Sequence, residues 1–479
     1  MTQYSDESVP TVQTDLRANA LSLTGATMQA VTHIAPAIAA FFFTQFVVSL
    51  AGITAPLAYL IGVIVVLMLG STLVQLSKHM PSAGGYYTYV SRAIHPRAGF
   101  LTAWMYVLYS PVVAGPIFAF FGFILEGELR SNYNIDAPWL WWVSVLVGAP
   151  TIALLQYRGI QISAKVMLVL GGIEIAIVGA LALTGFLQPG AGGITLDVFN
   201  PGRIGELSGF ALAVVFSVQG LTGWEASAPL AEETQDPRRN IPRSVGISII
   251  AIGGFLVLVY WGVMTGWGVN DIEGLVGSPV LPALALAHKF WGALWILVLF
   301  AFLNSVLAAC LATANVGTRM WYGMARSGSF PKALAKVHPT YKTPVNAILV
   351  QLALSLGSGI VPGLLFGPDT GFFLVAGLVL ALAVLFVYVM ANLAVFLFYL
   401  RERRAEFNVL LHAVFPLVST LVLLYATAKS FDPAPAYPFS LGPVVDGIWL
   451  AIGIAILLVL RARGREEWLR KAGAVLSES

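Results

Sequence analysis

Residues 223–242 read GWEASAPLAEETQDPRRNIP, and this stretch decides how the fold of the chain is interpreted. The stretch begins inside an apolar span at Gly223, which weakens a helix together with Gly220. It ends in a charged turn that contains Pro237 and Pro242. A span that breaks at half depth anchors poorly in a bilayer, but it presents backbone N–H and C=O groups to a ligand. Such groups can hold a carboxylate or an amine without any charged side chain.

The composition excludes a water-soluble fold. Of the 479 residues, 58% are hydrophobic and only 10% are charged, whereas soluble domains carry about 25% charged residues. A bilayer is spanned by about 20 apolar residues, and the chain contains twelve such stretches. The single Cys310 lies in an apolar run, so we expect neither a disulfide framework nor a metal site. The net charge of +3 gives no reason to expect a nucleic-acid partner.

The predicted architecture is an all-α integral membrane protein with twelve transmembrane helices. We expect one polytopic domain at 21–462, flanked by a polar tail (1–20) that lacks signal-peptide features and a basic tail (463–479). The third, eighth and tenth spans run long, which favours tilt or extension beyond the hydrocarbon. The predicted spans are 22–49, 55–78, 86–125, 138–157, 163–187, 207–230, 243–267, 290–322, 344–362, 370–400, 407–428 and 443–462.

The positions of the basic residues predict the orientation. With the N-terminus in the cytoplasm, 22 of the 26 Lys and Arg residues fall on the cytoplasmic side. The opposite side receives only Arg130, Arg203, Lys289 and Lys429. The positive-inside rule therefore predicts that both termini are cytoplasmic. We expect the chain to be a multi-pass protein of the plasma membrane.

Breaks are expected in two spans. In span one, Pro36 removes a backbone donor and pushes Ala35 away from helical geometry. In span six, Gly220 and Gly223 each lower helix stability by about 1 kcal/mol relative to alanine. One interrupted span at the start of each half is typical of an inverted five-helix repeat with a substrate site between the breaks. Two ordinary packing kinks are the alternative, since Gly and Pro are frequent in membrane helices.

Three segments carry a resemblance to a known family. Residues 81–90 read PSAGGYYTYV, close to a PxxGGxYxY pattern, and the span-six segment matches G-[FW]-[DE]-A…AEE…NPxRNIP. Residues 319–331 read RMWYGMARSGSFP and are followed by Thr343-Pro344, which matches R-x-x-x-x-M-A-R-x-G-x-x-P…TP. In this order, over roughly residues 20–460, they resemble the amino acid–polyamine–organocation transporter superfamily.

The resemblance implies the leucine-transporter-type fold. Spans 1–5 (21–190) and 6–10 (205–402) would form two inverted repeats, spans 11 and 12 (405–462) would be appended, and spans 1 and 6 would be unwound at mid-membrane. It also implies alternating access and substrates drawn from amino acids, polyamines and related cations. Where many members carry G-[ST]-G, this chain has Ala37-Ile38-Ala39, so either the backbone opens less or Pro36 opens it instead.

Backbone groups at the two breaks are the expected substrate contacts. Amides in the first break are expected to hold a substrate carboxylate, and carbonyls near Gly220 and Leu221 are expected to accept from a substrate ammonium group. Trp224 either covers this pocket or packs beside it. The resemblance adds Tyr109, Ser110 and Thr313 beside the substrate side chain. The predicted substrate site comprises Ala35, Pro36, Ala37, Ile38, Ala39, Tyr109, Ser110, Gln219, Gly220, Leu221, Thr222, Gly223, Trp224 and Thr313.

Glu174 is the main candidate for ion coupling. It aligns with a lysine that stands in for sodium in several relatives, and a carboxylate within an apolar span is expensive. Burial favours its protonated form, so Glu174 is either a reversible proton carrier or a permanently neutral, hydrogen-bonded group. The hydroxyl pair that would bind sodium falls near Ala308 and Ala309. We therefore expect coupling to protons or to no ion, and no bound cofactor.

Other polar residues within the spans are candidates for gating. Glu225, one turn past the second break, either meets a cationic substrate or pairs with a neighbouring helix. His33 either contacts substrate and relays a proton or is merely hydrogen-bonded in place. Asn304 and Asn315 share a face of span eight with Arg319, which suits a water-filled path or close helix packing. We interpret the charged run 232–243 mainly as a solvated cytoplasmic turn, with a possible part in closing the inner gate.

These patterns favour a plasma-membrane permease that carries an amino acid or a closely related amine by proton symport. The alternatives are a polyamine importer, an amino acid exchanger and a nutrient sensor that binds ligand without turnover. Long polycations are disfavoured, because Glu174 and Glu225 are the main carboxylates expected within the membrane. The sequence has no HExxH or GxSxG motif and no paired carboxylates at catalytic spacing, so we expect no enzyme active site.

Overall fold

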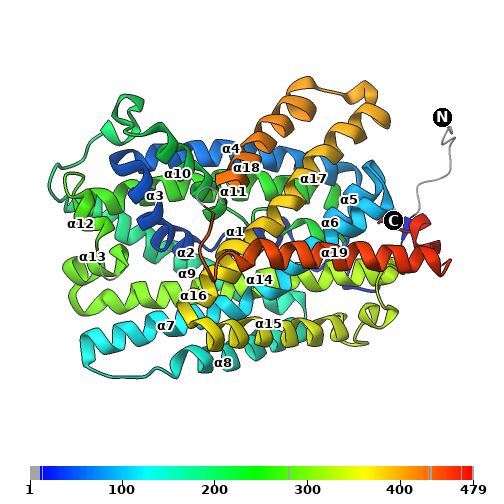
Figure 1. Ribbon diagram of the computed structural model, residues 1–479, viewed down its shortest axis with the longest axis horizontal. Helices are drawn as coiled ribbons and strands as arrows, with labels where there is room; N and C mark the ends of the chain where they lie inside the picture. Colours follow the sequence, from blue (N-terminus) through cyan, green and yellow to red (C-terminus); the bar gives the residue numbers. More distant parts are fainter. Residues whose placement is uncertain are drawn as a thin grey trace.

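The computed structural model describes residues 11–476 apart from 13, 279–280, 430, 432–433 and 465. The predicted tail residues 1–10 and 477–479 lie outside this range. The described residues are largely helical, and α7, α14, α15 and α19 run along the long axis of the molecule (Figure 1). The strands β1 (Thr11–Val12) and β2 (Val475–Leu476) pair in parallel and bring the two ends of the described chain together.

Within the described residues, nine α-helices precede residue 190, and α1 packs between α9, α11 and α14. In order, they are α1 (Leu23–Ile34), α2 (Pro36–Phe41), α3 (Phe43–Ala51), α4 (Ala55–His79), α5 (Tyr86–Ala93), α6 (Pro96–Val112), α7 (Ala114–Tyr133), α8 (Leu140–Tyr157) and α9 (Ile160–Leu187). Later in the chain follow α10 (Leu207–Gly220), α11 (Pro237–Trp267), α12 (Ile272–Val276), α13 (Pro282–Trp291), α14 (Ile296–Ser327), α15 (Val345–Phe366), α16 (Pro368–Phe372), α17 (Leu380–Arg401), α18 (Phe415–Lys429) and α19 (Leu441–Ala462).

Short turns connect or extend these helices. The 3₁₀ turns are η1 (Gly52–Thr54), η2 (Asp197–Phe199), η3 (Pro201–Arg203), η4 (Ala228–Glu233), η5 (Gly292–Trp295), η6 (Lys332–Ala335), η8 (Arg404–Glu406) and η10 (Glu467–Arg470). Two π-helical turns, η7 (Phe373–Val379) and η9 (Leu410–Val414), lie at the start of α17 and α18. The tenth predicted span therefore contains a local change of helical pitch.

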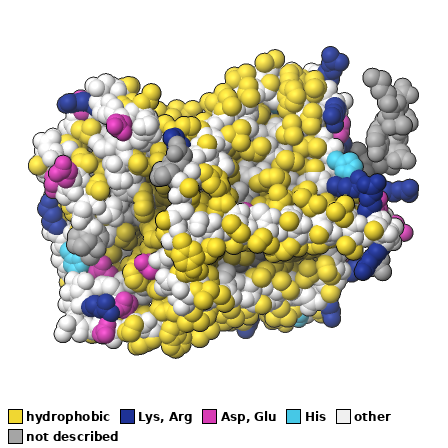
Figure 2. Space-filling view, viewed as in Figure 1, with side chains coloured by type: hydrophobic (Ala, Val, Ile, Leu, Met, Phe, Trp, Pro, Cys, Tyr) yellow, Lys and Arg dark blue, Asp and Glu magenta, His cyan; other side chains and the backbone are white. Residues whose placement is uncertain are grey.

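The surface identifies a multi-pass membrane protein. Within the described residues, ten helical stretches are long and apolar enough to cross a membrane. Large apolar side chains are exposed on several of them, among them Val147, Leu187 and Leu364, at 62%, 72% and 71%. Figure 2 shows hydrophobic side chains covering the middle of the visible face, with Lys and Arg gathered at the ends. Exposed apolar side chains of this kind are what lipid contact requires.

Prolines shift one predicted boundary. The stretch 86–125 was expected to be one span, but α5 ends at Ala93 and a new helix begins at Pro96. His95 is extended and caps α6 by accepting from the backbone N–H of Arg97 at 3.1 Å. The membrane-length stretch therefore runs over Pro96–Tyr133. Proline is favoured at the first position of a helix, which explains the new start.

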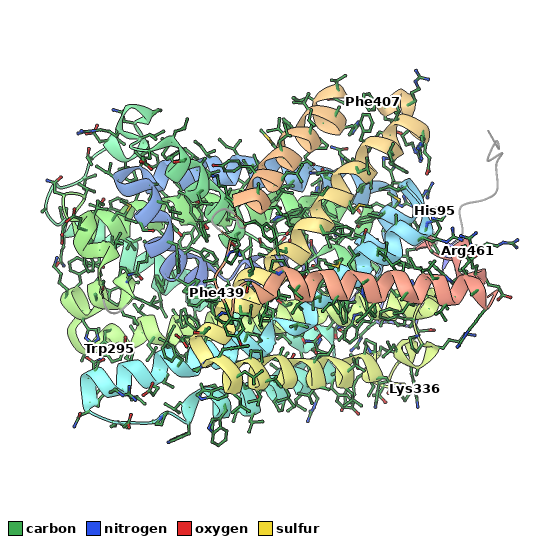
Figure 3. All side chains as sticks on the ribbon, in the orientation of Figure 1. His95, Trp295, Lys336, Phe407, Phe439 and Arg461 are labelled. Carbon is green, nitrogen blue, oxygen red and sulfur yellow. The ribbon has the colours of Figure 1, made fainter. Side chains whose placement is uncertain are left out.

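Segments that the predicted spans place on the same side of the membrane lie at the same end of the molecule. Figure 3 places His95, Lys336, Phe407 and Arg461 at one end of the molecule and Trp295 at the other. At the first end, Arg92 pairs with Glu402 at 2.8 Å. Part of the expected tail is also packed there, because the backbone N–H of Asp15 donates to Tyr322 OH at 3.2 Å and Leu16 is buried. Beside it, Leu21 exchanges backbone hydrogen bonds with Glu233 and Gln235, each at 2.9 Å.

Candidate functional site

The first helix break lies at Ala35 and Pro36. Helix α1 ends at Ile34, Ala35 adopts a left-handed conformation with φ 57° and ψ 71°, and α2 begins at Pro36. A left-handed alanine costs about 1–2 kcal/mol, so the surrounding packing must hold it. Ala37 to Ala39 are already helical. The interruption is thus confined to Ala35, directly before Pro36, and Ala37-Ile38-Ala39 does not interrupt the helix.

The second break follows Gly220. Helix α10 ends there, residues 221–227 form turns, and the chain continues as η4. Gly223 has φ 121°, a conformation that side chains disfavour. A Cβ at Gly223 would lie 2.7 Å from the carbonyl carbon of His33 and 2.8 Å from its oxygen. The two breaks therefore touch at backbone level.

Gly223→Ala is expected to disturb this contact. The added methyl group meets backbone rather than a flexible side chain, so the two segments must separate, at a cost of about 1–3 kcal/mol. We expect lower thermal stability in detergent and at least tenfold weaker ligand binding. Gly246→Ala, in α11, is the matched control, because a Cβ there meets no atom within 4 Å. Equal behaviour of the two variants would contradict the proposed close contact.

A cavity of about 570 Å³ lies between the two breaks. No charged side chain is among the described residues that line it. Aromatic rings dominate one part of its wall, where Phe120 stacks on Phe372 with ring centroids 4.2 Å apart. These rings were not among the predicted site residues, although runs such as Phe41-Phe42-Phe43 and Phe372-Phe373 could have suggested them. The missed lining residues include Phe42, Phe43, Phe46, Phe120, Phe372, Phe373 and Tyr388.

The structure brings about half of the predicted substrate residues to this cavity. The predicted substrate residues that line it are Ala35, Ile38, Tyr109, Gln219, Gly220, Thr222 and Thr313. Those that do not line it are Pro36, Ala37, Ala39, Ser110, Leu221, Gly223 and Trp224. Of the predicted coupling and gating residues, only one reaches the cavity, His33, and the others do not: Glu174, Glu225, Asn304 and Asn315. Trp224 is 2% exposed and packs on Tyr388, with ring centroids 5.4 Å apart, so packing is the observed role.

His33 and Tyr109 form the main polar pair of the cavity wall. Tyr109 OH lies 3.3 Å from Nε2 of His33, and the rings stack at 6.1 Å. Nδ1 of His33 is buried and has no hydrogen-bond partner among the described residues. Nearby, the hydroxyl of Ser110 donates to the carbonyl of Thr313 at 2.6 Å, which ties α6 to α14.

Glu174 caps the amide side of the first break. Its Oε1 accepts from the N–H of Ala37 at 2.6 Å and from the hydroxyl of Ser305 at 2.7 Å. Ser305 also accepts from the N–H of Ile38 at 3.3 Å. Oε2 of Glu174 is buried and unpartnered among the described residues. The amides expected to hold a substrate carboxylate are therefore already bonded to the protein's own side chains.

Glu225 has the same role at the second break. Its Oε2 accepts from the N–H of Gly223 at 3.1 Å, and its Oε1 accepts from Tyr106 OH at 3.4 Å. The side chain is fully buried. Of the two alternatives raised by the sequence, contact with neighbouring helices is the one seen in this conformation.

The amides of span eight serve as bridges between helices. Asn304 donates to the carbonyl of Leu170, and Asn315 donates to Oε1 of Gln29 at 3.4 Å. Gln29 in turn donates to the carbonyl of Ala312 at 2.7 Å. Of the two alternatives, a water-filled path and close helix packing, the contacts of these two side chains correspond to close packing with hydrogen bonds between helices.

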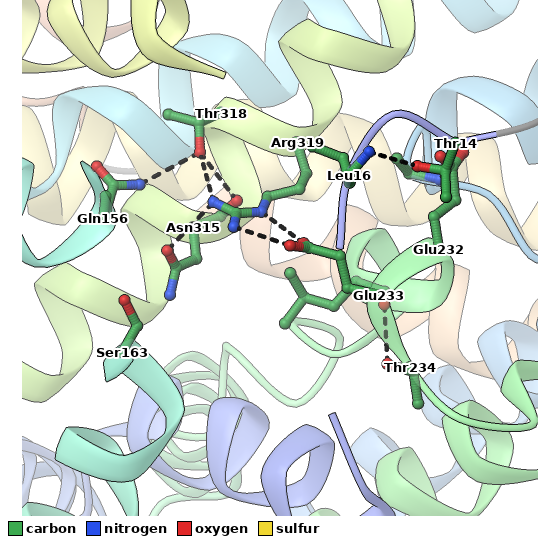
Figure 4. Close-up of polar contacts among 12 residues, drawn as sticks. Thr14, Leu16, Gln156, Ser163, Glu232, Glu233, Thr234, Asn315, Thr318 and Arg319 are labelled. Carbon is green, nitrogen blue, oxygen red and sulfur yellow. Dashed lines mark hydrogen bonds and ion pairs between the residues drawn. The ribbon is translucent and has the colours of Figure 1, made fainter. Parts of the chain in front are cut away.

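A buried ionic network joins the end of the second break to α14 (Figure 4). Arg319 binds Glu233 at 2.8 Å, and the two side chains are 0% and 1% exposed. Arg326 binds Glu232 at 2.5 Å. Interpreting residues 232–243 mainly as a solvated turn was therefore wrong for these two glutamates, because both are buried. Arginines of α14 contact their carboxylates, and Glu232 also accepts from the N–H of Ala83 at 2.9 Å.

The chain is similar to known proteins of one family. The amino acid permease family matches residues 25–460. The chain is 30% identical to an L-methionine/branched-chain amino acid exporter of Escherichia coli over 50% of this chain and 54% of that protein. It is 26% identical to a low-affinity putrescine importer of Escherichia coli over 63% of this chain and 66% of that protein.

A third relative is matched over more of its length. This serine/threonine exchanger of Bacillus subtilis is 24% identical over 84% of this chain and 85% of that protein. The matches to the two Escherichia coli relatives span only about half to two thirds of their lengths. The family match, in contrast, extends over most of the sequence. The chain therefore belongs to the amino acid permease family.

Proposed function

We propose that this chain is a secondary active transporter that moves amino acids or closely related amines across the plasma membrane by alternating access. The observation that carries the proposal is the cavity of about 570 Å³ lined by residues of both helix breaks. A broken helix pair that flanks a mid-membrane cavity supplies backbone groups for a small polar ligand. The relatives carry amino acids or putrescine by name, which fits this ligand class.

The proposed architecture completes the expected twelve spans. The ten apolar stretches already include α3, which runs on into α4 as Phe43–His79. Span one would consist of α1, α2 and α3, divided there from α4, and α10 to η4 would supply span six. Spans 1–5 and 6–10 would then form the inverted repeats, with both termini in the cytoplasm. The parallel pairing of β1 with β2 supports termini that share one side.

Alternating access needs a closed side and an open side. The Arg319–Glu233 pair would close the cytoplasmic side, since it ties the second break to α14 through charges that water does not reach. On the other side, the cavity wall includes Phe46, Pro435 and Phe439, so the aromatic rings there would form the outer gate. Transport then requires the ionic network to separate while the rings close.

Proton coupling through Glu174 is part of the proposal. Oε1 has two donors, whereas Oε2 has none among the described residues, so a proton on Oε2 would neutralise the group without breaking either contact. A buried carboxylate without a compensating cation is costly in a membrane. Loading and releasing this proton would change how firmly α9 holds the first break.

Counterflow in proteoliposomes tests the function. Vesicles loaded with one unlabelled amino acid or amine should accumulate the same radiolabelled compound transiently and saturably. Binding without counterflow would leave the sensor alternative, and absence of both for every amino acid and amine would overturn the proposal. Uptake into empty vesicles separates a symporter from an exchanger, the alternative suggested by the serine/threonine exchanger relative.

A further inference from the structure

The amide side of each break is occupied by a glutamate of the protein. The N–H of Ala37 donates to Glu174, and the N–H of Gly223 donates to Glu225. The N–H of Ile38 is also taken, by the hydroxyl of Ser305. A ligand carboxylate is normally held by such free N–H groups. In this conformation it would have to displace a buried side chain from each of them.

The carbonyl groups of the first break, in contrast to its N–H groups, lack backbone partners among the described residues. In a continuous helix, the carbonyls of His33 and Ile34 would accept from the N–H groups of Ala37 and Ile38. Those two N–H groups are bonded elsewhere, and no other backbone N–H of the described residues donates to either carbonyl. Both His33 and Ile34 line the cavity.

The second break shows the same asymmetry. Among the described residues, no backbone N–H donates to the carbonyls of Gly220 and Thr222, and both residues line the cavity. Nδ1 of His33, buried and unpartnered, adds a further polar atom on the same wall. The cavity therefore combines unsatisfied acceptors with occupied donors, which suits an ammonium group.

The remaining wall of the cavity determines which chemical groups the ligand can carry besides the ammonium group. It is apolar and rich in phenylalanine, and it lacks charged side chains within the described residues. A second ammonium group of a polyamine would find no carboxylate there. A ring or a large alkyl group would instead find the aromatic wall formed by residues such as Phe42 and Phe120.

From these contacts we infer that the substrate is a monoamine with a large apolar or aromatic group and no carboxylate, rather than an amino acid. Its ammonium group donates to the freed carbonyls of the two breaks, and its apolar part lies against the aromatic wall. Glu174 supplies the carboxylate that an amino acid would otherwise bring to Ala37. This inference rests on the proposed transport function and names the substrate class within it.

Matched ligand pairs test the inference with the full-length chain in lipid nanodiscs. Phenethylamine and tryptamine are compared with phenylalanine and tryptophan, which differ from them by the carboxylate alone. We expect each amine to bind at least tenfold more tightly than its amino acid. Phenylalaninol, which has a neutral hydroxymethyl group in place of the carboxylate, should bind nearer to the amine. It controls for the size of the extra group.

Two substitutions at one position supply the structural control. Glu174→Ala frees the N–H of Ala37 and should reduce the preference for the amine about tenfold. Glu174→Gln keeps an acceptor oxygen for Ala37 and should retain the preference. Each readout is the ratio of the affinities for amine and amino acid in one preparation. Partial misfolding of a variant lowers the number of binding sites for both ligands equally, so it does not change this ratio.

The outcomes separate this inference from the transport function. Equal or tighter binding of the amino acids, or an unchanged ratio in Glu174→Ala, would overturn the substrate class and leave an amino acid transporter. If neither member of either pair binds while another amino acid shows counterflow, the substrate class is again overturned. Absence of binding and of counterflow for every amino acid and amine would overturn the proposed function as well.

Discussion

Replacing Arg319 or Glu233 alone by methionine is expected to destabilise the protein by ~3–5 kcal/mol. Each single change leaves one charge without its partner in a site where both side chains are at most 1% exposed. For Arg319→Met, Glu233 loses both nitrogens that contact it, at 2.8 and 3.3 Å. The apparent melting temperature in detergent should fall clearly in both variants.

The double variant Arg319→Met/Glu233→Met separates stability from gating. Apolar replacement of a whole buried pair is often neutral for stability, so we expect melting close to that of the unmodified chain. Uptake should nevertheless remain at least tenfold lower, because only the Arg326–Glu232 pair would then join the end of the second break to α14 by charge. The exposed pair Arg203–Asp197 is the control, with an expected cost below about 1 kcal/mol. Melting of Arg319→Met indistinguishable from Arg203→Met would refute the argument.

Glu174→Gln is expected to abolish accumulation driven by a pH gradient while exchange continues. With one proton per substrate, a gradient of one pH unit, acidic outside, supports up to about tenfold accumulation, since about 1.4 kcal/mol corresponds to a factor of ten. Glutamine keeps an acceptor for Ala37 but cannot carry a proton on the second oxygen. The accumulation ratio of the variant should therefore fall to about one.

The measurement needs a clamped membrane potential, because a cationic substrate would also respond to voltage. Uptake is followed at several external pH values with the internal pH held constant, and it should rise as the external pH falls. Glu206→Gln, on an exposed side chain before α10, is the control and should keep this dependence. If accumulation by Glu174→Gln still follows the pH gradient, another group carries the proton.

Local signals in the sequence predicted the positions of the breaks. Pro36 lacks an N–H and restricts its predecessor, and Gly223 tolerates a positive φ, so both effects are properties of single residues. The apolar spans could also be predicted from local sequence, since each one needs about 20 apolar residues to cross the bilayer. Helix ends were less accurate, as at Pro96, where a proline starts a helix inside a predicted span.

Contacts between distant segments could not be predicted in this way. Glu174 and Ala37 are 137 residues apart, and nothing near either residue indicates that they meet. The same holds for Glu233 and Arg319, which are 86 residues apart. A charged run after a span usually faces water, so only the fold reveals that Glu232 and Glu233 are covered. Burial depends on the partners of a segment, and these are set by tertiary packing.

The short bridge between Leu21 and the second break has a consequence for the transport cycle. Leu21 forms hydrogen bonds with Glu233 and Gln235 on the same side as the ionic network. In the proposed cycle, opening that side therefore requires the segment around Leu21 to separate from the second break. This segment follows β1, which pairs with β2 near the carboxyl end of the described residues. In the proposed cycle, the paired segments β1 and β2 would therefore favour the inward-closed state and slow turnover without contacting the ligand.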